Sequence, residues 1–144
     1  MQQQTRVGVP PSTVVVGLFV ILAFGLPPIS ATDQSNFVGG DPTRPDSSDI
    51  RALRLRFEAG ARSNWHSHAG WQILAADEGR GRTQARGDAI QEMTPGDQPV
   101  YTAPGVVHWH GASPDEHVVQ LTFMGGPAGA SWFEPVTDDE YRGR

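Results

Sequence analysis

Four of the five histidines in this chain of 144 residues form two His-x-His pairs, His66 with His68 and His108 with His110. Side chains alternate along a β-strand, so each pair would project from one face of a strand. Gln72 follows soon after His68 and can return to the same face on the next run of residues. A single histidine is more often a surface residue, but two such pairs in a histidine-poor chain favour a metal site. Imidazole nitrogens and an amide oxygen suit a divalent transition metal.

The composition removes several other kinds of chemistry. All eleven basic residues are arginine, so no lysine is present to form a Schiff base or to act as a general base. There is no cysteine, which excludes disulfides, thiol nucleophiles and thiolate metal sites. Sixteen acidic residues against eleven arginines give a net charge of −5. This charge argues against nucleic acid as a partner, because proteins that bind nucleic acid usually show a basic face.

The first 31 residues predict an export signal that is not part of the fold. Residues 14–26 form an apolar run of 13, which fits the roughly 7–15 residues of a signal-peptide core and falls short of the roughly 20 of a membrane-spanning helix. We therefore expect a signal peptide over 1–31, cleavage near Ala31 and a periplasmic or extracellular protein. The alternative is an uncleaved anchor, the one case in which a membrane would be a partner.

The remaining chain predicts one all-β domain. Residues 32–49 are polar with several glycines and prolines, which predicts a flexible lead-in. Residues 50–136 hold short alternating runs separated by glycine and proline, typical of a sandwich or barrel of seven or eight strands. The charged segment 137–144 is expected to be a tail that frays. The predicted strands are 51–58, 64–68, 71–77, 80–86, 89–93, 98–102, 106–112 and 117–124.

Two motifs around the histidines resemble those of the cupin family. The first, Gly-x5-His-x-His-x3-(Glu/Gln)-x6-Gly, is matched over 60–79 with Gln72 in the acid position, and the second is matched more loosely around Gly105 and His108. More narrowly, the strings GAR-x-x-WHSH and APG-x-x-HWHGA, within residues 51–141, resemble small bacterial cupins that include manganese-dependent hydroxynitrile lyases. The resemblance implies an all-β cupin fold, which is a double-stranded β-helix or jelly-roll barrel.

The resemblance also implies a metal and its ligands. Members of that group bind manganese or iron through three histidines and a glutamine, and the matching positions here are His66, His68, Gln72 and His108. The expected cofactor is therefore a divalent transition metal, Mn(II) first and Fe(II) next. His110 matches a further histidine beside the metal, where the lyases place groups that handle the substrate proton. A homodimer is the oligomer that the family resemblance favours.

His110 is the candidate catalytic acid or base. A histidine with an ordinary pKa of about 6.5 can give or take a proton near neutral pH. The alternative is that His110 orients a water or a neighbouring group without moving protons. The lyases carry another active-site histidine where this chain has Gln120, and that departure puts cyanohydrin chemistry in doubt. His117 lies three residues away, so strand alternation would put it on the opposite face, as a surface or sheet-packing residue.

The chemistry expected of this site is Lewis-acid chemistry on a small organic substrate. A neutral ligand set leaves a divalent ion its full charge, which polarises a bound oxygen. The inner face predicted from strand alternation is largely apolar and carries no arginine, which suits a small uncharged molecule. The predicted pocket residues are Leu53, Leu55, Phe57, Ser63, Leu74, Gln120, Thr122 and Met124.

Three functions follow from these features, and the fold does not decide among them. The first is an exported metal-dependent enzyme with lyase chemistry, for which cleavage of a hydroxynitrile carbon–carbon bond is the nearest analogue. The second is a metal-dependent dioxygenase of the quercetinase type, which would consume oxygen. The third is a non-catalytic module that binds a metal or a small ligand.

Overall fold

The structure is a computed structural model that describes residues 36–144, and all its helices and strands lie in a unit formed by residues 43–144. The predicted signal peptide, 1–31, lies outside the described residues. Residues 36–50 form neither helix nor strand. Among the described residues, no helix is long and apolar enough to cross a membrane.

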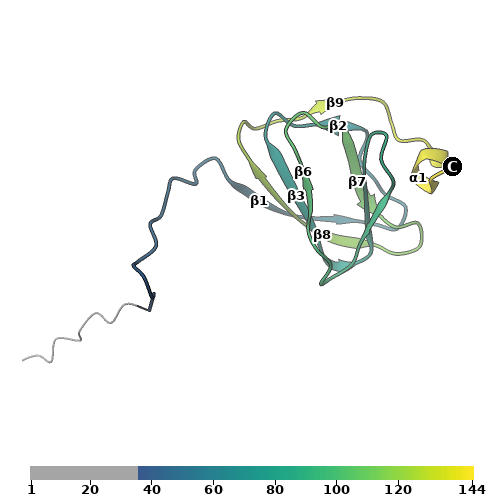
Figure 1. The fold of residues 1–144 in the computed structure, drawn as a ribbon. Coiled ribbons are helices and arrows are strands. Elements are labelled where there is room, and N and C mark those ends of the chain that lie inside the picture. Colours follow the sequence, from purple (N-terminus) through teal and green to yellow (C-terminus); the bar gives the residue numbers. More distant parts are fainter. Residues whose placement is uncertain (1–35) are drawn as a thin grey trace, which may run out of the picture. The chain divides into compact units, whose positions relative to one another are not determined.

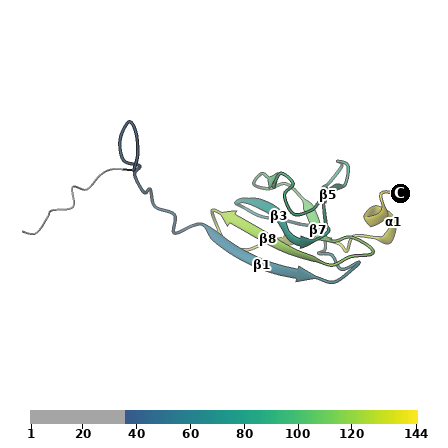
Figure 2. The same cartoon turned by 90° about the horizontal axis from the view of Figure 1, so that it is seen from below.

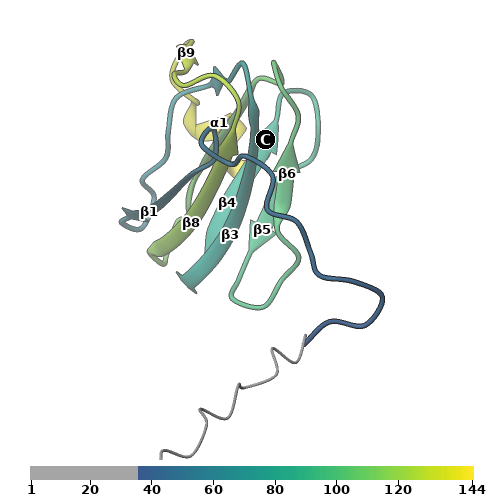
Figure 3. The same cartoon turned by 90° about the vertical axis from the view of Figure 1, so that its left-hand side faces the viewer.

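Two antiparallel sheets make up the domain (Figure 1). The first sheet has four strands in the order β1 (Arg51–Phe57), β8 (Val118–Gly125), β3 (Trp71–Gly79) and β6 (Val100–Thr102). The second sheet has five strands in the order β5 (Gln91–Met93), β4 (Gly81–Ala85), β7 (His108–Ala112), β2 (His66–Ser67) and β9 (Ser131–Trp132). In Figures 2 and 3, strands β1, β8 and β3 of the first sheet lie side by side in the opposite layer.

The register of the first sheet sets the inner face that meets the histidines. Leu53 pairs with Thr122 and Leu55 pairs with Gln120 between β1 and β8. Directly opposed residues in antiparallel strands share a face, so these side chains form one row across the sheet.

At the end of β3 the chain turns at Gly79, where φ is 68° and an added Cβ would lie 2.0 Å from the carbonyl oxygen of His117. Only glycine fits that turn.

Each of the eight predicted segments contains a strand, although several strands are shorter than predicted. The largest difference is β2, which comprises only two residues of the predicted strand 64–68. Before β2 the chain contacts β7 at isolated points, through a single bridge between Arg62 and Gly111 and a hydrogen bond from the Ser63 amide to the His110 carbonyl (2.9 Å). The strand β9 was not predicted, because two residues are too few to show alternation.

The second sheet has a core on its outer side as well as its inner side. Trp65 and Trp109 are buried and pack with Val136 and Tyr141. Both tryptophans directly precede or follow a histidine of the candidate site, so strand alternation sends them to the opposite face. Strand alternation thus accounts for the outward packing, and the C-terminal segment provides the partner through Val136 and Tyr141.

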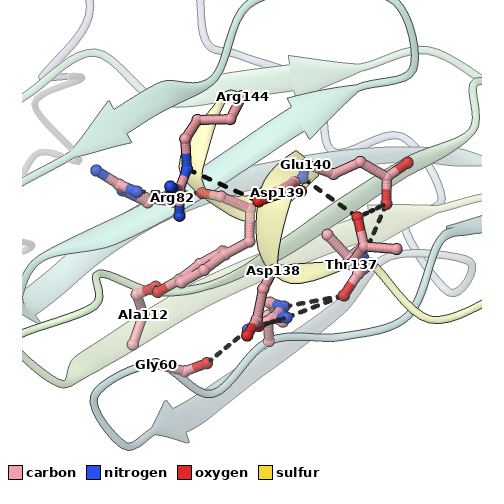
Figure 4. A network of polar contacts seen from close by, with 11 residues as sticks. Gly60, Arg82, Ala112, Thr137, Asp138, Asp139, Glu140 and Arg144 are labelled. Atoms are coloured by element: carbon pink, nitrogen blue, oxygen red, sulfur yellow. Dashed lines mark hydrogen bonds and ion pairs between the residues drawn. The ribbon is translucent and has the colours of Figure 1, made fainter.

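The prediction that residues 137–144 fray is wrong. They contain a short helix, α1 (Asp138–Arg142), which begins with a capping box between Thr137 and Glu140 and ends at Gly143 in the left-handed conformation. Figure 4 shows the polar contacts that attach this helix to the sheet. The hydroxyl of Tyr141 donates to the carbonyl oxygen of Ala112 at 2.7 Å, and the ring is buried. Charge alone predicted solvent exposure, whereas the capping pattern and one aromatic anchor order the segment.

Candidate metal centre

Three histidines converge between the sheets. His66 on β2 pairs directly with His108 on β7, and His68 follows one residue after β2. One ring nitrogen from each of the three lies within 4.8 Å of the others, which makes them the only group of three or more histidine, aspartate or glutamate residues in residues 36–144 arranged to hold a metal ion. We call His66, His68 and His108 the histidine cluster.

Backbone carbonyls fix the orientation of each ring in the histidine cluster. The Nδ1 atoms of His66 and His108 each donate to the carbonyl oxygen two residues earlier, at 3.0 Å in both cases. The Nδ1 atom of His68 donates to the carbonyl oxygen of Gly129 at 2.9 Å. A carbonyl oxygen only accepts, so Nδ1 carries the proton and Nε2 keeps a free lone pair. Such contacts commonly orient metal-binding histidines.

Two further observations fit a cation at this point. The Nε2 atom of His68 is buried and has no hydrogen-bond partner among the described residues. Gln72, on β3 of the other sheet, places its Oε1 atom 2.7 Å from Nε2 of His108. In a neutral His108 ring these two atoms both offer lone pairs, and a shared cation resolves that unfavourable contact. The donor set of three imidazoles and an amide oxygen suits a divalent transition metal.

The electrostatics keep the rings of His66 and His108 uncharged and available as ligands. Burial lowers the pKa of His66 from its ordinary value of 6.5 to about 4, with a smaller contribution from the neighbouring histidines. Burial likewise lowers the pKa of His108. A metal competes with protons for the same lone pairs, so a lowered pKa leaves the ligand atoms free near neutral pH.

His110 lies beside the histidine cluster without joining it. Its ring centroid is 5.1 Å from that of His66, and it meets the ring of Phe57 edge-on at 5.7 Å. Burial holds the pKa of His110 well below its ordinary value. On its Nδ1 side it contacts the amide nitrogen of Gln120 at 3.3 Å. The remaining histidine, His117, lies just before β8 and outside the cluster.

A cavity of about 370 Å³ opens onto the histidine cluster and carries no charged lining residue. Six predicted pocket residues line it together with three of the four ligand candidates, whereas His108, Leu74 and Gln120 do not line it. Leu74 is fully buried where β3 meets β6 and β8, and Gln120 contacts His110 instead. The lining residues are Leu53, Leu55, Phe57, Ser63, His66, His68, Gln72, His110, Thr122, Met124 and Trp132.

Trp132 is the lining residue that sequence reasoning did not place in the pocket. It lies on β9, is 63% exposed, and its ring centroid is 4.8 Å from that of His66. No alternating pattern in the sequence predicts the direction of the Trp132 side chain, because β9 pairs with β2 over two residues only. An aromatic residue shortly after the glycines of 125–129 was the only local signal.

A larger cleft, of about 610 Å³, lies outside the barrel, where β4 and the β4–β5 turn meet α1. Arginines line it, but Arg82 pairs with Glu92 at 2.6 Å and Arg86 pairs with Glu134. No histidine lines this cleft, whereas His66, His68 and His110 line the inner cavity.

Several known proteins resemble this chain in sequence or in fold. Over 101 residues the chain is 40% identical to (R)-mandelonitrile lyase of Granulicella tundricola, an alignment covering 68% of this chain and 76% of the relative. The crystal structure of a cupin-like protein from Thermotoga maritima superposes with a TM-score of 0.61 and 42% identity, covering 66% of this chain and 72% of that one. A cupin 2 domain-containing protein from Halorhodospira halophila shares the fold, with a TM-score of 0.52 and 19% identity over 67% of this chain and 66% of that chain. No protein-family model matches the chain.

Two antiparallel sheets around a cluster of histidines that could hold a metal ion define a small β-barrel protein with a candidate metal centre in its interior. Two of these relatives are at least 40% identical to the chain over the aligned residues, and one of the two is named a cupin-like protein. The chain belongs to the cupin family, as its two motifs predicted.

Proposed function

We propose that this protein is a metal-dependent lyase that cleaves the carbon–carbon bond of a small, uncharged hydroxynitrile. The observation that carries the proposal is the histidine cluster, whose Nε2 lone pairs converge with Gln72 at the inner end of an uncharged cavity. The similarity to (R)-mandelonitrile lyase supports the reaction class and an aromatic substrate. The apolar walls formed by Leu55, Phe57 and other side chains suit such a molecule.

His66, His68, His108 and Gln72 would hold a divalent ion, for which Mn(II) is our first choice and Fe(II) our second. When bound, the ion supplies Lewis-acid stabilisation of negative charge on a substrate oxygen. In the overall reaction the hydroxyl proton leaves, the carbon–carbon bond pair departs with cyanide, a carbonyl forms and cyanide gains a proton. His110 is the group beside the cluster that can carry such a proton.

The test combines metal content with turnover. The protein purified without chelator should contain about one manganese or iron ion per chain and release benzaldehyde from (R)-mandelonitrile. His66→Ala and His108→Ala should lose the metal and at least about 100-fold in rate, because a metal contributes several kcal/mol of charge stabilisation. The matched control is His117→Ala, which removes a histidine outside the cluster and should keep both properties.

Two outcomes would overturn the proposal. One is a protein that takes up neither Mn(II) nor Fe(II) after reconstitution. The other is a metal-loaded protein that leaves hydroxynitriles intact but consumes oxygen with a flavonol, which would assign it to the dioxygenases. Running the hydroxynitrile assay with and without oxygen separates these reactions, since a lyase requires no oxygen.

A further inference from the structure

The buried amide of Gln120 has an unusual set of hydrogen-bond partners. Gln120 lies on β8 with no exposed surface. Its Nε2 atom lies 3.3 Å from Nδ1 of His110 and donates to Oγ1 of Thr122 at 2.9 Å. Its Oε1 atom is buried and has no hydrogen-bond partner within residues 36–144. The amide nitrogen therefore faces two atoms that can accept a hydrogen bond, and the amide oxygen faces no donor from residues 36–144.

The amide nitrogen and the two atoms beside it match in hydrogen-bonding capacity. An amide nitrogen carries two hydrogens, and Nδ1 of His110 and Oγ1 of Thr122 can each accept one of them. An amide nitrogen cannot itself accept, so its contact with His110 is a hydrogen bond only when Nδ1 offers a lone pair.

We propose that Gln120 is a positioning residue that fixes the ring proton of His110 on Nε2, so that His110 presents an N–H donor to the cavity. A neutral imidazole carries one proton, and Nδ1 accepts the hydrogen bond from Gln120. Nε2 of His110 has no hydrogen bond to any residue between 36 and 144, and His110 lines the cavity whereas Gln120 does not. The free N–H is therefore available to a bound molecule.

The same strand then carries two histidines with opposite ring protonation. His108 donates from Nδ1 to a backbone carbonyl and keeps a lone pair on Nε2, which suits a metal ligand. His110, two residues along β7, accepts at Nδ1 and carries its proton on Nε2. The Val106 carbonyl thus leaves His108 able to bind a metal, and the Gln120 amide leaves His110 able to donate a hydrogen bond.

The use of this donor rests on the proposed function. In hydroxynitrile cleavage, Nε2–H of His110 would donate a hydrogen bond to the departing cyanide and stabilise the negative charge that develops on it. The hydroxyl proton leaves the substrate as the carbonyl forms and cyanide takes up a proton, so the reaction balances with the His110 ring neutral before and after. A donor that already points into the cavity needs no prior change of tautomer.

The test reads the proton directly and does not depend on turnover. Nitrogen-15 NMR of the histidine ring nitrogens would be recorded on the full chain, metal-free and with diamagnetic Zn(II), and His110→Asn would assign the His110 signals. We expect Nδ1 of His110 to give the signal of an unprotonated nitrogen and Nε2 that of a protonated one, the reverse of His108. A protonated Nδ1 in the unmodified protein would overturn the proposal, whatever its activity.

Two substitutions test whether Gln120 is the cause. Gln120→Glu offers only acceptors, so Nδ1 of His110 should become protonated and its signal should move to the protonated range. Gln120→Met keeps the size without the hydrogen bond, so the Nδ1 signal should shift away from its hydrogen-bonded position. Gln98→Glu, the same change on an exposed loop, should leave both signals unchanged. Signals that stay unchanged in a folded Gln120→Met protein would show that Gln120 does not position the proton.

Discussion

Gln72 is the residue that sets the charge of the candidate metal centre. The histidine cluster supplies neutral imidazoles, and Gln72 Oε1 lies 2.7 Å from Nε2 of His108 in the position where many metal sites use a carboxylate. Because an amide carries no charge, a divalent ion held here would keep its full charge toward a substrate. The side chain is buried, so water screens that charge little.

Gln72→Glu should therefore tighten metal binding while weakening Lewis-acid chemistry. A carboxylate neutralises part of the ion's charge, and a gain of about tenfold in affinity corresponds to about 1.4 kcal/mol. Competition with a chelator would measure the affinity for Mn(II), and benzaldehyde release would measure the loss of rate. Gln98→Glu adds the same charge at an exposed position and should change neither. An unchanged affinity in Gln72→Glu would mean that Gln72 is not a ligand.

The helix α1 shows how a short element becomes stable by attachment. Five residues are too few for a helix to persist alone, because nucleation costs more than so few hydrogen bonds return. Here the capping box begins the helix, and Tyr141 anchors it against Trp109 with ring centroids 5.5 Å apart. The guanidinium of Arg62 lies 4.3 Å from the centre of the Tyr141 ring. The helix thus completes the outer core of the second sheet.

Tyr141→Ala should lower the free energy of unfolding by about 3–5 kcal/mol, as removal of a buried aromatic ring generally does. The substitution opens a cavity beside Trp109 and removes the hydrogen bond to the Ala112 carbonyl. Urea denaturation would measure the change. Tyr101→Ala is the matched control, since Tyr101 is 60% exposed on β6, and it should cost less than about 0.5 kcal/mol. Equal losses in the two variants would contradict the anchoring role of Tyr141.

Alternation along the chain was sufficient to predict the strands that carry the site. Leu53 and Leu55 fall on the cavity face, and the His-x-His spacing predicted which rings converge, because both depend on local period alone. The contact of His68 with Gly129 and the position of Trp132 depend on a segment some sixty residues away, which no local pattern encodes. Long-range pairing of that kind is set by tertiary structure.

The protein as a whole holds several neutral histidines in its interior. Burial lowers the pKa of His66 to about 4 and lowers those of His108 and His110 as well. An unfolded histidine titrates near its ordinary value of about 6.5, so the unfolded chain binds more protons than the native protein below that pH. Acidification through this window therefore favours unfolding. Export of the protein and its assembly as a homodimer remain predictions from the sequence, and neither bears on this dependence of stability on pH.

The metal-free protein should lose stability as pH falls from about 6.5 to about 4, and stability above that window should be nearly constant. A pKa change from 6.5 to about 4 corresponds to about 3 kcal/mol for His66 alone. Denaturant titrations at a series of pH values would measure the free energy of unfolding. His117→Gln should retain the same profile, because His117 lies outside the buried group. A flat profile across this window would contradict the neutral interior.

Trp132 gives the molecule an optical signal of its own. Of the four tryptophans, two are locked in the outer core, whereas Trp132 is exposed at the mouth of the cavity with its ring against His66. Light emitted by an indole is quenched by a paramagnetic ion a few ångströms away and changes colour when the surrounding water is displaced. Binding of a metal ion or an aromatic ligand in the cavity therefore changes the intrinsic tryptophan fluorescence of the protein.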